Sequence, residues 1–307
     1  MSNSVNMLSN TLIVLVGPTA IGKTAASIKI AKEFNSPIVS ADSRQFFKEM
    51  CIGTAKPTAE EMQDIPHYLI DSHSISDDYN VGKYETEVVE LLDKLFLTNK
   101  TVILVGGSGL YIDAICKGFD ELPEADAEVR SKINLLLEEK GIEALQSLLK
   151  ELDPVYYSKV DLQNPQRMSR ALEVCLTTGE PYSSLRKGTI KKRDFNIIKI
   201  GLNTSREVLY ERINKRVDEM MELGLLEEVK KLVPMKQSNA LQTVGYKELF
   251  DFIEHKTDLN KAIDSIKQNT RKFAKRQLTW FRRDEEIKWF EPNQISEILK
   301  YINQKQF

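Results

Sequence analysis

One run of residues has the types and spacing that bind phosphate. The segment GPTAIGKT, residues 17–24, matches the pattern G-x-x-x-x-G-K-[ST] completely. In such a loop, glycines let backbone N–H groups curl around phosphate oxygens, the lysine reaches the outer phosphate and the threonine ligates magnesium. We therefore predict a phosphate-binding loop with Mg²⁺ as cofactor and Thr24 as its ligand. Its eight residues are Gly17, Pro18, Thr19, Ala20, Ile21, Gly22, Lys23 and Thr24.

A carboxylate follows the next apolar segment of the chain. The segment PIVSA, residues 37–41, is typical of a buried strand, and Asp42 comes directly after it. Ligands of parallel sheets bind beyond the carboxyl ends of the strands, so we expect Asp42 to project toward the same crevice as Lys23. There it could act as a general base, commonly worth about 10² to 10⁴ in rate. The alternative is an aspartate that only caps a turn.

The residues for hydrolysis of a nucleoside triphosphate are incompletely visible. That chemistry usually places an aspartate at the end of a buried strand, where it holds magnesium. The apolar segment at residues 101–105 ends instead in GGSGLY, which has no carboxylate, and Asp71 after residues 67–70 is a possible substitute. The loop IGTAKP, residues 52–57, is expected to form a wall of the same site. This pattern favours a phosphate that leaves in some other group transfer.

The elements that position these groups alternate between strand and helix. Buried strands are predicted at residues 11–16, 37–41, 67–70, 101–105 and 195–202, and helices at residues 23–34, 81–97, about 205–232 and 259–284. Between about residues 124 and 187 only amphipathic helical segments occur. We predict an α/β fold, a P-loop parallel-sheet core with an inserted all-helical subdomain. The predicted parts are 1–122 (first part of the core), 123–190 (inserted subdomain) and 191–307 (completion of the core).

The composition is that of an ordinary globular protein. Of 307 residues, 41% are hydrophobic and 29% charged. No apolar run approaches the roughly 18 residues of a membrane span, and the first ten residues lack a basic patch followed by an apolar core. The three cysteines are far apart, which indicates neither a disulfide framework nor a cysteine zinc site. We expect a cytoplasmic monomer without a membrane partner.

The net charge of −2 hides a strong segregation. The segment from Ser265 to Arg283 has seven basic residues and no acidic one. Such a cationic helix is a candidate for binding polyanions, and the alternative is a solvated helix face. The seven are Lys267, Arg271, Lys272, Lys275, Arg276, Arg282 and Arg283.

Seven motifs in their order resemble the tRNA dimethylallyltransferases. The resemblance extends from about Leu12 to Arg283, through GPTAIGKT, ADSRQFFKEMCIGTAKP, GGSGLY, NPQRMSRALEV, LYERINKRVDEMMELGLLEEV, VGYKEL and TRKFAKRQLTWFR. That family transfers a dimethylallyl group from dimethylallyl diphosphate to N6 of the adenosine on the 3′ side of the anticodon, position 37. The resemblance implies that the loop at residues 17–24 holds the diphosphate of the prenyl donor.

The resemblance also implies catalytic roles. Asp42 would take a proton from N6, and Arg216 would neutralise charge on the departing diphosphate. Ser108 stands where the family usually has threonine. The hydroxyl is kept, so its hydrogen bond to the reacting centre survives, although its rotamer is less fixed.

Four segments and two single residues, Ser108 and Arg130, are implied to bind the anticodon stem-loop. For Trp280 the interpretations are stacking on a base or anchoring of the core, and for each arginine the alternative is a surface salt bridge. The implied tRNA-binding residues are Asp42, Ser43, Arg44, Gln45, Ser108, Arg130, Gln166, Arg167, Met168, Ser169, Arg170, Gly245, Tyr246, Lys247, Lys275, Arg276, Gln277 and Trp280.

Three other functions are weighed against prenyl transfer to tRNA. A P-loop kinase would turn over ATP with a small acceptor. Prenyl transfer to free AMP would need neither the basic helix nor the helical subdomain. An RNA-binding regulator without chemistry would not need an intact loop and Asp42.

Overall fold

In the described part of the chain, six strands form one parallel sheet. The computed structural model describes residues 10–120, 122–123 and 126–306, so most of the ten-residue N-terminal segment considered above lies outside the described residues. The strands, in the order β3-β2-β4-β1-β5-β6 across the sheet, confirm the predicted α/β class. Strand β6 was not predicted, because three residues are too short for a clear pattern. The strands are β1 (Thr11–Val16), β2 (Ile38–Ser40), β3 (His67–Tyr68), β4 (Thr101–Gly106), β5 (Asn196–Leu202) and β6 (Lys288–Phe290).

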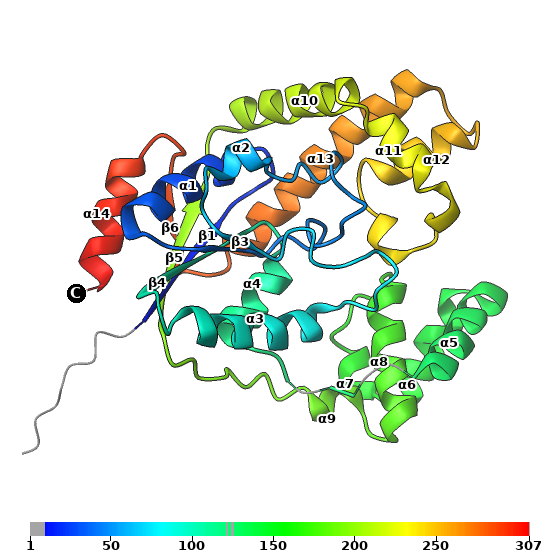
Figure 1. Cartoon of the computed structure of the whole chain (residues 1–307). Coiled ribbons are helices and arrows are strands. Elements are labelled where there is room, and N and C mark those ends of the chain that lie inside the picture. Colours follow the sequence, from blue (N-terminus) through cyan, green and yellow to red (C-terminus); the bar gives the residue numbers. More distant parts are fainter. Residues whose placement is uncertain (1–9, 121, 124–125, 307) are drawn as a thin grey trace, which may run out of the picture. The chain divides into compact units, whose positions relative to one another are not determined.

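The chain divides into two compact units. The first comprises residues 1–116 and 193–307, and the second comprises residues 117–192. Figure 1 shows the helices of the first unit around the sheet. They are α1 (Lys23–Phe34), α2 (Ala59–Met62), α3 (Val81–Leu95), α4 (Gly109–Lys117), α10 (Arg206–Glu222), α11 (Leu225–Lys231), α12 (Tyr246–Ile253), α13 (Leu259–Phe281) and α14 (Ile295–Gln306), with 3₁₀ turns at Val233–Met235 and Asn239–Leu241.

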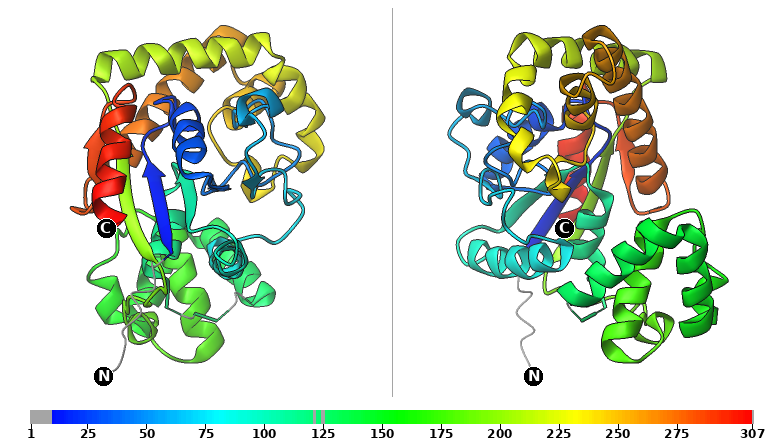
Figure 2. Two further views of the ribbon diagram at one scale, coloured as in Figure 1. Left: turned by 60° about the vertical axis from the view of Figure 1, so that its left-hand side comes forward. Right: turned by 90° about the vertical axis from the view of Figure 1, so that its right-hand side faces the viewer.

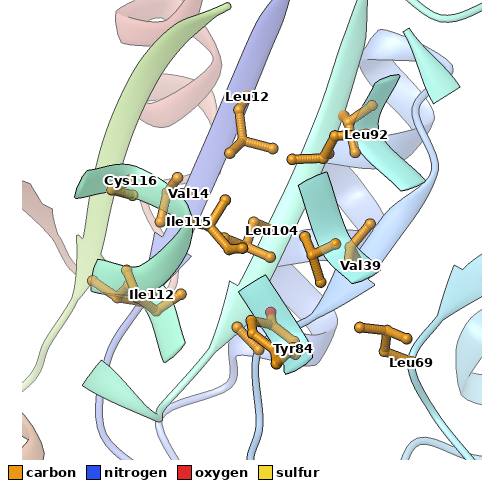
Figure 3. Packing of buried hydrophobic residues seen from close by; sticks show 14 of the residues in the cluster. Leu12, Val14, Val39, Leu69, Tyr84, Leu92, Leu104, Ile112, Ile115 and Cys116 are labelled. Carbon is orange, nitrogen blue, oxygen red and sulfur yellow. The ribbon is translucent and has the colours of Figure 1, made fainter. Parts of the chain in front are cut away.

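Successive side chains of β1 point to opposite faces of the sheet and join an apolar cluster on each face. Leu12 and Val14 point to a cluster formed with α3 and α4, which Figure 3 shows closely packed. Ile13 and Leu15 point to the opposite cluster, formed with α1, α10 and α14. Figure 2 shows α14, in red, beside β5. With both faces covered, β1 is a fully buried run, as parallel strands usually are.

A third cluster of apolar side chains joins helices α10 to α13. The sequence pattern predicted one helix over about residues 205–232, and this prediction was wrong at Gly224. Gly224 has φ 96°, a conformation that favours glycine, and it separates α10 from α11. The turn lets Val217 and Leu225 pack together with α12 and α13.

The second unit has its own core of helices. Ile133, Leu145, Leu149 and Leu172 belong to one buried apolar cluster of this unit. Its helices are α5 (Ala127–Lys140), α6 (Ile142–Leu152), α7 (Pro154–Tyr157), α8 (Pro165–Thr178) and α9 (Tyr182–Leu185). In the described part of either unit, no helix combines the length and the apolar character that crossing a membrane requires.

Candidate active site

The phosphate-type loop is shaped by two glycines and one lysine. Gly17 has φ 155°, and a Cβ there would lie 2.7 Å from the carbonyl oxygen of Leu202. Gly22 adopts a left-handed conformation directly before α1. The Nζ of Lys23 donates hydrogen bonds to the carbonyl oxygens of Gly17, at 3.0 Å, and Pro18, at 2.9 Å. The lysine therefore folds back over the loop, where its charge and the N-terminus of α1 favour an anion together.

The surroundings of Lys23 disfavour its charged form. Burial lowers the pKa of Lys23 to about 8, Asp42 opposes this shift, and the like charge of Arg216 adds to it. Desolvation disfavours a charged ammonium group, whereas a bound anion would favour it. Binding of an anion and protonation of Lys23 should therefore favour each other.

The sheet order brings Asp42 and Ser108 beside this loop. Residues 17–24 follow β1, Ser108 follows β4 and Asp42 follows β2, and β4 lies between the other two strands. Close packing of the strand ends requires Gly106, because a Cβ there would lie 2.2 Å from the carbonyl oxygen of Ala41. The expectation that Asp42 projects to the crevice of Lys23 agrees with their electrostatic interaction.

Hydrogen bonds fix both side chains. The Ser108 hydroxyl accepts a hydrogen bond from the backbone N–H of Ser43, at 2.9 Å, and lies 3.1 Å from the Ser43 hydroxyl. One carboxylate oxygen of Asp42 accepts from the backbone N–H of Arg44, at 3.0 Å. Asp42 therefore makes the turn-capping bond, and this bond also holds its partly exposed carboxylate in place.

Arg216 reaches the loop from α10. Its guanidinium donates to the hydroxyl of Thr19, at 3.3 Å, and to the carbonyl oxygen of Ala55, at 3.4 Å. Burial lowers the pKa of Arg216, while Asp42 and more distant carboxylates act in the opposite direction. An arginine keeps its charge under such a shift, so Arg216 brings a second cation to the loop.

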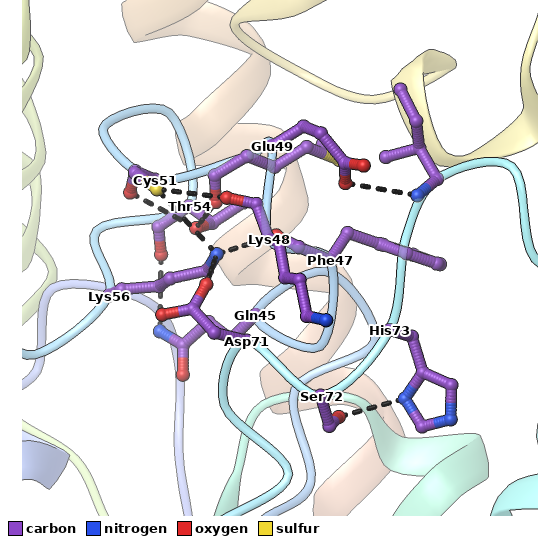
Figure 4. Close-up of polar contacts among 12 residues, drawn as sticks. Gln45, Phe47, Lys48, Glu49, Cys51, Thr54, Lys56, Asp71, Ser72 and His73 are labelled. Atoms are coloured by element: carbon purple, nitrogen blue, oxygen red, sulfur yellow. Dashed lines mark hydrogen bonds and ion pairs between the residues drawn. The ribbon is translucent and has the colours of Figure 1, made fainter.

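The loop at residues 52–57, predicted to form a wall of the site, is contacted by Gln45 and Arg216. The amide of Gln45 donates to the carbonyl oxygens of Thr54 and Ala55, each at 3.2 Å. Figure 4 shows the Lys56 side chain reaching the carbonyl oxygen of Phe47 and the carboxylate of Asp71. Asp71 is thereby occupied by an ion pair, which argues against it as a substitute magnesium ligand.

Glu228 is a residue that the sequence did not reveal. Its carboxylate accepts hydrogen bonds from the backbone N–H groups of Cys51, Ile52 and Gly53, at 2.7 to 3.1 Å, and from the hydroxyl of Tyr246, at 2.7 Å. In the sequence it is one of two adjacent glutamates on an amphipathic helix, a pattern typical of a solvated face. No local signal distinguishes it, because its partners lie far along the chain.

The basic helix α13 presents its charges in two directions. Lys275 and Arg276 are exposed. By contrast, Lys267 pairs with Asp218 at 2.6 Å, and Arg271 donates to Asn214 at 2.6 Å, so both turn toward α10. The cationic face available to a polyanion is therefore narrower than the sequence indicates.

The second unit holds another group of predicted residues on α8. Gln166 and Arg167 are exposed, and Ser169 is partly buried. Arg130 and Arg170 both contact the buried carboxylate of Glu173, at 2.8 and 3.3 Å. These two arginines therefore make the salt bridges that the alternative interpretation expects, while their side chains stay 54% and 36% exposed.

Burial argues against direct RNA contact by three of the predicted side chains, and a fourth, Trp280, is bonded inside its unit. Met168 and Tyr246 are completely buried, and Gln277 is 7% exposed. Trp280 is partly buried, and its indole N–H donates to Asp113 at 2.9 Å, so the structure supports the core-anchor interpretation. The four side chains pack or bond inside their own units. Beside Tyr246, Gly245 is buried and Lys247 is exposed.

The residues present fit a magnesium ion that is bound mainly by its substrate. Among the residues that the structure describes, no group of three or more His, Cys, Asp or Glu is placed to hold a metal. Mg²⁺ usually keeps several waters and binds through one or two protein groups plus phosphate oxygens. The partly exposed Thr24 at the start of α1 has the oxygen that such a site uses.

A family model and full-length relatives match this chain. The model described as IPP transferase matches residues 45–284. The chain belongs to the IPP transferase family. This chain is also similar to the tRNA dimethylallyltransferases of Christiangramia forsetii and Bacteroides thetaiotaomicron. They are 54% and 50% identical, over 97% and 95% of this chain and 99% and 95% of their own lengths.

Solved structures of the IPP transferase type share the fold. The tRNA isopentenylpyrophosphate transferase of Bacillus halodurans is 37% identical, with a TM-score of 0.72 and 97% of each chain covered. A eukaryotic dimethylallyltransferase, described as acting on tRNA, is 27% identical, with a TM-score of 0.78. That comparison covers 97% of this chain and 77% of the other.

Proposed function

We propose that this protein transfers a dimethylallyl group from dimethylallyl diphosphate to N6 of adenosine 37 in tRNA and releases diphosphate. The observation that carries this proposal is the convergence of Lys23, Arg216 and Asp42 at one edge of the sheet, two cations for a diphosphate and one carboxylate for a proton. Membership of the IPP transferase family supports it. The tRNA dimethylallyltransferase relatives support the choice of acceptor.

The reaction is a displacement at C1 of the prenyl group. It needs stabilisation of the diphosphate leaving group and a base for the proton on the attacking N6. The N6 nitrogen forms a bond to C1 of the prenyl group, the bond from C1 to the diphosphate oxygen breaks, and the diphosphate departs with that electron pair. Lys23, Arg216 and the N–H groups of residues 17–24 place positive charge where negative charge grows, which is usually the largest catalytic contribution. Asp42 accepts the proton that N6 loses.

Ser108 follows β4, and β4 lies between β1, which precedes the diphosphate loop, and β2, which precedes Asp42. Its hydroxyl bonds to both the backbone and the side chain of Ser43, which ties the turn after β4 to the turn after β2. We propose that Ser108 and residues 42–45 line the pocket for the flipped adenine. The adenine must leave its stack, which costs a few kcal/mol in a duplex and less in a loop.

The tRNA is proposed to contact exposed cationic side chains. On α13 these are Lys275 and Arg276, and on α8 Arg167, with Gln166 beside it. Arg130 and Arg170 keep exposed guanidinium surface beside Glu173, and Lys247 is exposed at the start of α12. Contacts of this kind to phosphates position a nucleic acid without reading its sequence.

Magnesium is proposed as the cofactor. Thr24 and oxygens of the diphosphate would hold it, and when bound it would neutralise charge on the leaving group. The monomeric state and the cytoplasmic location stay predictions.

The test combines three acceptors in one experiment. The purified protein is incubated with dimethylallyl diphosphate, Mg²⁺ and either unmodified tRNA, AMP or a small alcohol with ATP. The expected result is the mass gain of one dimethylallyl group on a single adenosine of tRNA. Transfer to AMP alone, or transfer of a phosphoryl group from ATP to the alcohol with release of ADP, would contradict the proposal and favour the free-nucleotide or kinase alternative. Tight tRNA binding without any transfer would instead favour a regulator.

A further inference from the structure

One buried amide on α13 bridges two loops of the candidate active site. The Oε1 of Gln277 accepts a hydrogen bond from the backbone N–H of Thr19, at 2.8 Å, and its Nε2 donates to the carbonyl oxygen of Gly107, at 2.9 Å. These partners are 258 and 170 residues away in sequence. One side chain thus joins the loop after β1 to the turn after β4.

The side chain of Gln277 is buried and tightly surrounded. Gln277 is 7% exposed, and a Cβ on Gly107 would lie 2.3 Å from its Nε2. Both polar ends of the amide are engaged with backbone groups, the N–H of Thr19 and the carbonyl oxygen of Gly107. A buried backbone N–H or carbonyl without a partner is costly, so the glutamine is specified at this position by chemistry as well as by shape.

Thr19 is held from two helices at once. Its backbone N–H is bound by Gln277 of α13, and its hydroxyl accepts from Arg216 of α10. On the other side of the bridge, the turn at residues 106–109 carries Ser108, whose hydroxyl binds Ser43 next to Asp42. Hydrogen bonds and the peptide link between Gly107 and Ser108 therefore connect the loop proposed to hold the prenyl donor with the residues proposed to hold the acceptor.

We infer that Gln277 is a positioning residue that sets the distance between the diphosphate loop and the acceptor pocket. The inference rests on the proposed function. Displacement requires N6 and C1 in near-attack geometry, and an error of about 1 Å can cost about 100-fold in rate. Lys275 and Arg276 are exposed and precede Gln277 by two residues and one residue, so a ligand bound to them lies within one helical turn of the bridge.

The first experiment measures the bridge itself. In Gln277→Met the side chain has similar length but offers no hydrogen bond to Thr19, so amide hydrogen exchange at Thr19 should accelerate at least about tenfold. Thr279→Ala, an exposed change on the same helix, serves as the matched control and should leave this exchange unchanged. Unchanged exchange at Thr19 in Gln277→Met would overturn the inference whatever the reaction proves to be.

The second experiment measures the consequence for catalysis. We expect kcat for transfer from dimethylallyl diphosphate to tRNA to fall about 10- to 100-fold in Gln277→Met, while KM for tRNA stays within about threefold. A loss that appears only in KM for tRNA would mean that Gln277 contacts RNA and would overturn the positioning role. An inactive parent protein with the Thr19 amide still protected would contradict the proposed function and leave the bridge established.

A conservative variant covers the case in which Gln277→Met does not fold. Gln277→Glu keeps the shape, and only its protonated form can both accept from Thr19 and donate to Gly107. Because burial favours the neutral carboxyl group, lowering the pH should restore the bridge, so kcat relative to the parent protein should rise as the pH falls. A ratio independent of pH would contradict the role assigned to the two hydrogen bonds.

Discussion

The guanidinium of Arg216 donates a hydrogen bond to the hydroxyl of Thr19 across 197 residues of sequence, at 3.3 Å. The same guanidinium donates to the carbonyl oxygen of Ala55. Arg216 therefore holds the phosphate-type loop and the wall of the site in one planar fork, a geometry that an ammonium group cannot reproduce. Its orientation is fixed before any anion binds.

Replacing Arg216 should impair handling of the diphosphate. We expect Arg216→Lys to lower kcat/KM for dimethylallyl diphosphate by about 10² to 10³, the usual effect of removing one preorganised charge-stabilising donor. Lys215→Gln is the matched control, because Lys215 is the next residue of α10 and its side chain is 80% exposed. Steady-state kinetics at saturating tRNA measure the effect. Equal kinetics in the two variants would contradict a role for Arg216 at the leaving group.

The sequence predicted five strands, all but the short β6, and the phosphate-type loop with Asp42 beyond the next strand, because these signals are local. GPTAIGKT needs a strand before it and a helix after it, and both are found as β1 and α1. Asp42 follows a short apolar run that could only be a buried strand. The proximity of Asp42 to Lys23 then follows because parallel strands have their carboxyl ends at the same edge of the sheet.

The remainder depends on contacts that no local pattern encodes. Gln277 and Tyr246 lie in motifs that the family resemblance linked to tRNA, yet their partners are a backbone N–H at Thr19 and a carboxylate at Glu228. Glu228 itself looks like a solvated glutamate until the loop at residues 51–53 folds onto it. The break at Gly224 was missed because apolar spacing continues through it.

Asp42 and Asp71 offer a direct comparison between two aspartates. Asp42→Asn keeps the acceptor for the Arg44 N–H but removes the basic oxygen, so we expect kcat to fall by about 10² to 10⁴ with tRNA affinity within a few-fold. Asp71→Asn should leave kcat within about threefold, since the carboxylate of Asp71 is engaged in an ion pair with Lys56. Single-turnover assays and filter binding measure the two quantities. A large loss of tRNA binding in Asp42→Asn would mean that Asp42 recognises RNA.

Lys23 should make binding of the diphosphate sensitive to pH. Because its pKa is lowered to about 8, the free protein loses this charge as the pH rises through that value. Binding above about pH 8 must then be accompanied by proton uptake. We expect the affinity for inorganic diphosphate to fall up to about tenfold between about pH 7 and about pH 9, which is the cost of one pKa unit. Calorimetry in buffers of different ionisation enthalpy measures both the affinity and the proton uptake.

The control for this pH dependence is Lys23→Gln. Titration of the diphosphate itself is the same for both proteins, so the difference between the two pH profiles isolates the lysine. The variant should bind more weakly at about pH 7, and its proton uptake near pH 8 should disappear. A profile for the parent protein parallel to that of Lys23→Gln would show that Lys23 stays charged over this range.

The exposed charges of α13 should determine part of the salt dependence of tRNA binding. Each phosphate contact contributes about 0.7 to 0.9 to the slope of log K against log salt, so the double variant Lys275→Ala, Arg276→Ala should lower the magnitude of that slope by about 1.4 to 1.8. Lys300→Ala, Lys305→Ala removes the same charge from exposed positions of α14 and should leave the slope unchanged. Equal slopes for the two double variants would exclude α13 from the RNA interface, because loss of net charge alone would then account for both.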